Sequence, residues 1–216
     1  MSGHSHAHQG LALQRGDILL KRAVLSDWRH AVIALGQKLG GSSKATTVHA
    51  ALYVGDNHIA ESSGAGLSLA PFDGVDTWKV YRLTNGDKLA GLAATFALHL
   101  VDRAGRTGGF GAYGTVSAVK SAFASARDED EIASDINDYA NQALSEMGGA
   151  TREFFCSNYV VQCYSIASEY ENAARGALAG LLYAIPLDHE RTSPADLAEY
   201  FETPMSGWHK VGEMRG

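Results

Sequence analysis

Cys156 and His49 are the two residues whose types and settings could support nucleophilic chemistry. A thiolate attacks carbonyl carbon, and a neighbouring imidazole can generate it at neutral pH. Cys156 lies in "REFFCSNYVVQCY", and the apolar residues after it, from Val160 to Ile166, recur with helical spacing, so we predict a helix with Cys156 in its first turn. The unpaired amides and the dipole of a helix N-terminus favour a thiolate and can hold a developing oxyanion.

The second cysteine, Cys163, stands seven positions beyond Cys156 (163 − 156 = 7). Seven residues of helix rise about 10.5 Å, whereas bridged cysteines need Cα atoms within roughly 7 Å of each other. The C-x6-C spacing, with no histidine nearby, is also unlike that of zinc sites. We therefore predict that Cys163 is a small buried hydrophobic residue, and we expect neither a metal nor another cofactor.

The base for Cys156 should be one of nine histidines. Three alternate in the leader "MSGHSHAHQG", where they could bind a metal ion weakly or belong to a disordered tail or an expression remnant: His4, His6 and His8. Four stand in helical or loop patterns typical of surface positions: His30, His99, His189 and His209. His49 differs because it lies inside the apolar strand pattern "TVHAALYVG", where a ring must be satisfied in the core or face a cleft.

A third member of the site depends on the turn of the hairpin predicted over "TTVHAALYVGDNHIAES". A three-residue turn at positions 55–57 places Glu61 on the same face as His49, as a diagonal neighbour about 7–8 Å away at Cα. A carboxylate there would fix the tautomer of the imidazole and stabilise its charged form. A two-residue turn at positions 56–57 would reverse the alternation and remove Glu61 from that face.

The remaining patterns predict the elements that position these residues. "GDILLKRAV" and "TWKVYRL" are strand-like, while Asp87–Gly105 and segments 115–126 and 128–149 are helical. In "RTSPADLAEYF", Ser193 suits a helix N-cap and Pro194 the first helical position. We predict a flexible leader over residues 1–13 and a single α+β domain over residues 14–216.

Two motifs in the helical section carry weaker signals. "GFGAYG", Gly109 to Gly114, fits G-x-G-x-x-G, but no strand precedes it, so a loop is favoured over a dinucleotide site. Tyr113 in this loop could line a cleft, bind substrate and assist an oxyanion. The acidic run Asp128–Glu131 is typical of a solvated helix start rather than a metal site.

Composition argues against several classes of partner. The net charge is −6, and the 18 basic residues form no cluster, so nucleic acid is not expected. The longest apolar runs, Leu89–Leu98 and Ala177–Leu187, fall well short of the roughly 20 residues that span a bilayer. The N-terminus lacks the pattern of a secretory signal, so we expect synthesis in the cytoplasm and any export by another route.

Four segments in this order, "GDILL", "VHAALYVGDNHIAES", "FFCSNYVVQCY" and "SPADLAEYF", resemble the circularly permuted branch of the NlpC/P60 papain-like superfamily, which includes YiiX-like amidases and, more distantly, lecithin retinol acyltransferases. The resemblance implies a small antiparallel sheet packed against helices, with Cys156 as nucleophile, His49 as base and Glu61 as the residue that orients the base. It also implies a bacterial hydrolase that cleaves amide bonds of peptidoglycan stem peptides. The long helical section from Asp87 to Gly149 would then wall the cleft.

Delivery into the periplasm of a rival cell by a type VI secretion apparatus would reconcile that substrate with the missing signal. Such an effector implies a secretion-apparatus partner and an immunity protein. Two alternatives stay open: acyl transfer or lipid or thioester hydrolysis, as in the acyltransferase relatives, and a binding module that lacks catalysis.

Overall fold

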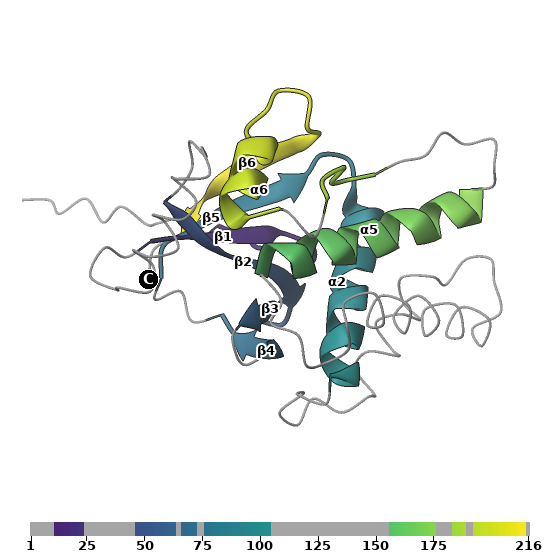
Figure 1. Ribbon diagram of the computed structural model, residues 1–216, viewed down its shortest axis with the longest axis horizontal. Helices are drawn as coiled ribbons and strands as arrows, with labels where there is room; N and C mark the ends of the chain where they lie inside the picture. Colours follow the sequence, from purple (N-terminus) through teal and green to yellow (C-terminus); the bar gives the residue numbers. More distant parts are fainter. Residues whose placement is uncertain are drawn as a thin grey trace, which may run out of the picture.

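The computed structural model describes residues 11–23, 46–63, 66–72, 76–104, 156–175, 183–188 and 192–214. Its strands are β1 (Ile18–Arg22), β2 (Thr47–Gly55), β3 (His58–Ser63), β4 (Gly66–Pro71), β5 (Trp78–Leu83) and β6 (Trp208–Met214). Its helices are α2 (Asp87–Arg103), α5 (Cys156–Arg175) and α6 (Pro194–Phe201). The strands form one antiparallel sheet in the order β4-β3-β2-β1-β5-β6, which confirms the predicted α+β class (Figure 1).

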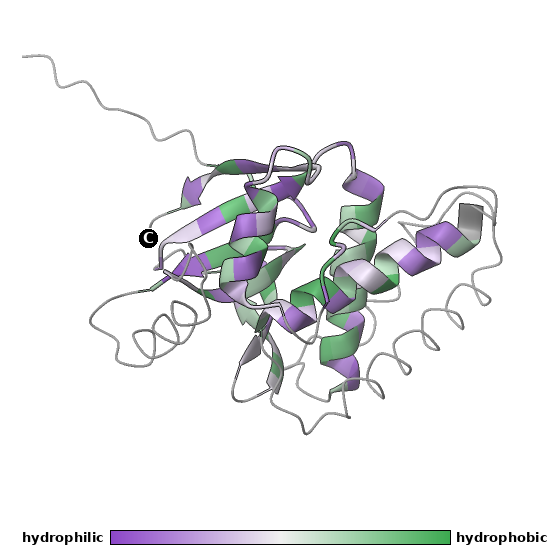
Figure 2. Ribbon diagram, turned by 45° about the horizontal axis from the view of Figure 1, so that its top comes forward, coloured by the Kyte–Doolittle hydropathy of each residue, from purple (hydrophilic) through white to green (hydrophobic). Residues whose placement is uncertain are grey.

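The main core lies between the sheet and the helices α2 and α5, which pack against each other and against β2 (Figure 1). Side chains alternate across a strand, so Ile18 and Leu20 of β1 face this core together with Leu52 of β2. Apolar residues are concentrated along α2 and the central strands (Figure 2). Helix α2 forms the start of the section from Asp87 to Gly149 that was expected to wall a cleft. This helix is instead part of the main core.

A smaller cluster covers the opposite face of the sheet. It contains Leu19, Ala51, Ile59, Phe72 and Trp78, all of which are buried. Leu13, at the end of the predicted leader, packs against this cluster. His49 and Glu61 belong to this face, because residues 49 and 51 of β2 lie on the same side and Glu61 pairs with Ala51.

The residues before β1 join the sheet to both core helices. Asp17 is buried and accepts two 2.7 Å hydrogen bonds from the Arg82 guanidinium of β5. The Tyr164 hydroxyl of α5 donates to the Gly16 carbonyl at 2.5 Å. Gly16 has φ +89°, and a Cβ there would collide with Ala90 of α2, so glycine is required where these elements meet.

The hairpin has the two-residue turn, one of the two alternatives that the sequence allows. Asp56 and Asn57 form a two-residue turn with φ values of 48° and 59°, and Gly55 pairs with His58. The predicted reversal of faces does not follow, because a bulge between Tyr53 and Gly55 shifts the register back.

This bulge has a packing reason. It directs Ala60 into the helix-facing core and leaves Glu61 on the other face. Without the extra residue, the whole of β3 would present its opposite set of side chains to the core, including a carboxylate.

Several other predictions can be compared with the described residues. Strands β1 and β5 and the helix from Asp87 are present, and α6 begins with the predicted cap: the Ser193 hydroxyl accepts from the Asp196 amide, and the Asp196 carboxylate accepts from the Ser193 amide. The edge strands β4 and β6 were not predicted.

Segments 115–126 and 128–149, with the motif at Gly109 to Gly114, lie outside the described residues. None of the described helices has the length and apolar composition required to cross a membrane.

Candidate active site

The β2–β3 hairpin brings a histidine and a carboxylate into direct contact. Glu61 pairs across the strands with Ala51, which makes it the diagonal neighbour of His49 on one face. The His49 Nε2 and Glu61 Oε2 atoms are 2.7 Å apart, so the predicted contact is present. About one fifth of each side chain is exposed, at 20% and 22%. The pair is sheltered but within reach of a ligand.

Cys156 reaches this pair from α5, of which it is the first residue. The start of α5 lies beside β2 (Figure 1), and the Cys156 side chain is close enough to the His49 ring to raise its pKa. Cys156 is 8% exposed, so it is largely buried but keeps some contact with solvent. The structure thus unites three side chains that the sequence separates by up to 107 positions (156 − 49 = 107).

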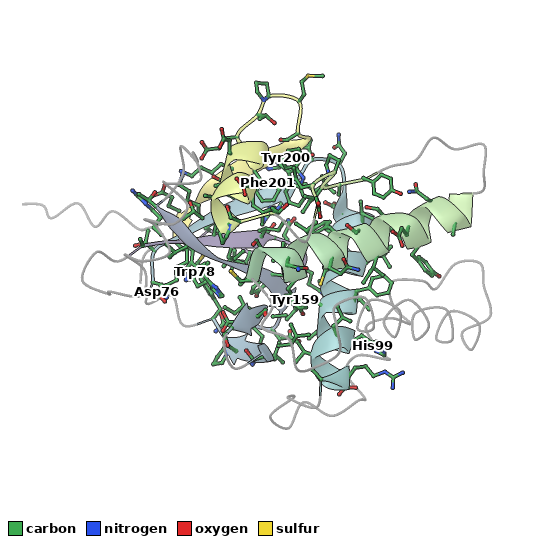
Figure 3. The ribbon with its side chains drawn as sticks, in the orientation of Figure 1. Asp76, Trp78, His99, Tyr159, Tyr200 and Phe201 are labelled. Atoms are coloured by element: carbon green, nitrogen blue, oxygen red, sulfur yellow. The ribbon has the colours of Figure 1, made fainter. Side chains whose placement is uncertain are left out.

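Two buried hydrogen bonds hold the first turn of α5 in place. The Ser157 hydroxyl donates to the Thr192 carbonyl at 2.6 Å, which ties the turn to the segment before α6. The Tyr159 hydroxyl donates to the Ala97 carbonyl of α2 at 2.7 Å (Figure 3 labels Tyr159). Because both donors are fully buried, these bonds restrict how far Cys156 can move relative to the sheet.

The contacts of His49 change its acidity. Burial of the ring lowers the pKa, but hydrogen bonds and charge interactions with Cys156 and Glu61 outweigh burial and raise the pKa of His49 from 6.5 to about 9. The imidazolium is therefore the dominant form of His49 at neutral pH. A positive ring between a thiol and a carboxylate is suited to stabilise a thiolate and later to donate a proton.

Cys163 occupies a different environment. It is fully buried two turns along α5, and burial raises the pKa of its thiol far above the ordinary value. Both cysteines are free, as the helical spacing predicts. The two thiols thus differ in exposure and in partners, and only Cys156 has a base beside it among the described residues.

Sequence reasoning missed Trp78 of β5 and Lys21 of β1. The Trp78 ring lies edge to face with the His49 ring, with centroids 6.0 Å apart and an interplanar angle of 61°. Lys21 pairs with both His49 and Trp78 across the sheet, so the three residues form one lateral row. Only knowledge of the strand order could have revealed this row, since no local pattern links β5 to β2.

The other candidate residues do not join this site. His99 lies on α2, and His209 lies on β6 with its Nδ1 3.0 Å from the Thr84 hydroxyl. Tyr113 lies outside the described residues, as do the remaining leader and surface histidines: His4, His6, His8, His30 and His189. The described part of the chain contains no group of three potential metal ligands among His, Cys, Asp and Glu.

Comparisons of this chain with protein-family models, with curated proteins and with solved structures give no match. The chemistry of the site must therefore be argued from Cys156, His49 and Glu61 themselves.

Proposed function

We propose that this chain is a cysteine hydrolase that cleaves amide bonds, with Cys156 as nucleophile, His49 as acid and base, and Glu61 as the group that orients His49. The observation that carries the proposal is one imidazole that is hydrogen-bonded to a carboxylate and lies beside a thiol at a helix start. The order of the segments, histidine strand before cysteine helix, supports a permuted papain-like fold.

The steps follow from the positions of the three groups. Glu61 engages Nε2 of His49, which leaves Nδ1 for the thiol of Cys156. In the attacking form of the site the proton is on the His49 ring and Cys156 is a thiolate, which forms a bond to the substrate carbonyl carbon. His49 then protonates the leaving nitrogen as the C–N bond breaks, which leaves a thioester on Cys156. The neutral ring takes a proton from water, the hydroxide displaces the thiolate, and a carboxylic acid is released.

The proposed substrate class is the stem peptide of bacterial peptidoglycan, and its only support is the family resemblance of the quoted segments. Delivery as a type VI effector, with an immunity protein that blocks the cleft, is part of the same proposal. Toxicity that appears only when the chain is directed to the periplasm of a test bacterium would support this location of the target. Equal growth with cytoplasmic and periplasmic expression would count against it.

The deciding experiment is mass-spectrometric analysis of purified peptidoglycan after digestion by wild type, Cys156→Ala, His49→Ala and the control Cys163→Ala. We expect new peptide ends with wild type and Cys163→Ala only. Acyl esters and thioesters are tested in parallel, and turnover of these compounds alone would identify an acyl transferase or lipid hydrolase instead. If no amide is cut and Cys156 reacts with iodoacetamide no faster than Cys163, the chain is a binding module.

A further inference from the structure

We infer that Trp78 is a positioning residue for His49, held in place by an ion pair between Lys21 and Asp76. The inference rests on the proposed function, because it assigns Trp78 a part in orienting the same imidazole. Figure 3 shows Trp78 and Asp76 labelled at the same end of the sheet.

The contact with Trp78 restricts how the His49 ring can rotate. His49 interacts with Glu61 and with Cys156, which lie on different elements. Both interactions persist only if the imidazole plane keeps one orientation, since rotation about the Cβ–Cγ bond moves both nitrogens. Trp78, with its centroid 6.0 Å away and its plane at 61°, limits this rotation.

Trp78 itself is fixed. Its side chain is 4% exposed, and Phe72 packs on it with centroids 6.3 Å apart. The Lys21 ammonium lies 5.9 Å from the indole centroid, in the range of a cation–π contact. Lys21 also binds Asp76 at 2.6 Å, two residues before Trp78. The indole is therefore in contact with Phe72 and Lys21, and the Lys21–Asp76 ion pair lies at the start of its strand.

Charged and titratable groups lie around His49. The groups that face it are Glu61 from β3, Cys156 from α5 and Lys21 from β1, with Asp76 against Lys21. Asp76 offsets the ammonium of Lys21, so this neighbouring cation need not repel an imidazolium. We therefore assign the Lys21–Asp76 pair a role in holding Trp78 beside a positively charged ring.

A double-mutant cycle on the alkylation rate of Cys156 tests this inference. Iodoacetamide is added to the folded chain near pH 7, and labelling of Cys156 and of Cys163 is followed by mass spectrometry. We expect Trp78→Leu and His49→Gln each to slow labelling of Cys156 on the order of tenfold, because a misaligned or missing imidazolium stabilises the thiolate poorly. The double variant should be no slower than His49→Gln, because Trp78 acts through His49.

Two matched controls separate positioning from general stability. Trp208→Phe alters another buried tryptophan, 6% exposed and hydrogen-bonded to the Ala184 carbonyl, and should leave the rate unchanged. Lys21→Met keeps the indole and should slow labelling mildly. Lys79→Met breaks the nearby Lys79–Glu202 pair, whose lysine is 17% exposed against 19% for Lys21, and should have no effect. Independent slowing by Trp78→Leu and His49→Gln, or equal rates in Trp78→Leu and Trp208→Phe, would overturn the inference.

A second readout works even if Trp78→Leu does not fold. Because an imidazolium quenches an adjacent indole, wild-type tryptophan fluorescence should increase as His49 loses its proton, with a midpoint near the pKa of about 9. His49→Gln should abolish this transition, and equal transitions in both proteins would refute the ring contact. Cys156 could be alkylated as fast in His49→Gln as in wild type while the fluorescence transition is still lost in His49→Gln. In that case the proposed function fails and the contact between Trp78 and His49 stands.

Discussion

Replacement of Glu61 by glutamine should lower the pKa of His49 while leaving the fold in place. Glutamine has nearly the same shape and can still accept a hydrogen bond, but it carries no charge. In the wild type, Cys156 and Glu61 together overcome the effect of burial and raise the pKa from 6.5 to about 9. This increase of about 2.5 pH units corresponds to about 3 kcal/mol in favour of the imidazolium, at about 1.4 kcal/mol per unit.

The share of Glu61 can be bounded from the same contacts. Burial opposes the increase, so the two partners must together supply more than about 3 kcal/mol. Glu61, 2.7 Å from the ring, supplies the smaller part, and a share of about 1.4 kcal/mol would mean that Glu61→Gln lowers the pKa of His49 by about one pH unit. The loss should reduce the imidazolium population around pH 8.

Proton NMR titration of the ring C–H signals measures this change directly. The His49 signal is assigned by its absence in His49→Gln, and reducing agent is present throughout. Glu199→Gln, at an exposed position of α6, provides a control with the same chemical change. A wild-type His49 that titrates near 6.5, or an unchanged titration in Glu61→Gln, would refute the electrostatic reasoning.

Three further predictions concern stability. The folded state binds the His49 proton more tightly than the unfolded state, so the stability that this proton contributes is complete below pH 6.5 and is lost as pH rises through about 9. The free energy of unfolding measured in urea should therefore fall by up to about 3 kcal/mol across that window, and this fall should be absent in His49→Gln. Ser193→Ala removes the N-cap of α6 and should lower the free energy of unfolding by about 1 kcal/mol, whereas Ser193→Asp should retain most of it. Cys163→Ala leaves a small void in the core and should lower stability by about 1 kcal/mol without changing the labelling rate of Cys156; a slower rate would mean that the two thiols are coupled.

The strand and helix patterns determined much of the local structure. The helix at Cys156 and the cap at Ser193 depend on residues a few positions apart, whose periodicity and hydrogen bonding act locally. The edge strands β4 and β6 could not be predicted in the same way. The first, "GLSLAP", contains glycine and proline, and the second, "WHKVGEM", mixes charged residues with apolar ones, so neither has a strong pattern of its own.

In the hairpin, the predicted contact between His49 and Glu61 forms with the turn that was expected to prevent it. The residue types at 55–57 allowed either turn length, and the structure has the two-residue form. Glu61 nevertheless faces His49, because a bulge at Val54 restores the alternation. The bulge is selected by which side chains are buried against α2 and α5, and this selection depends on helices far along the chain.

The sequence by itself determined which residues could react: a cysteine at a helix start, a histidine in an apolar strand and a carboxylate twelve positions later (61 − 49 = 12). Only the tertiary structure decided that Cys156 lies beside His49, that the Trp78 ring contacts the imidazole and that α2 belongs to the core. The physical reason is that residue type and periodicity act over one or two turns, whereas contacts between elements depend on strand order, register and burial across the whole chain.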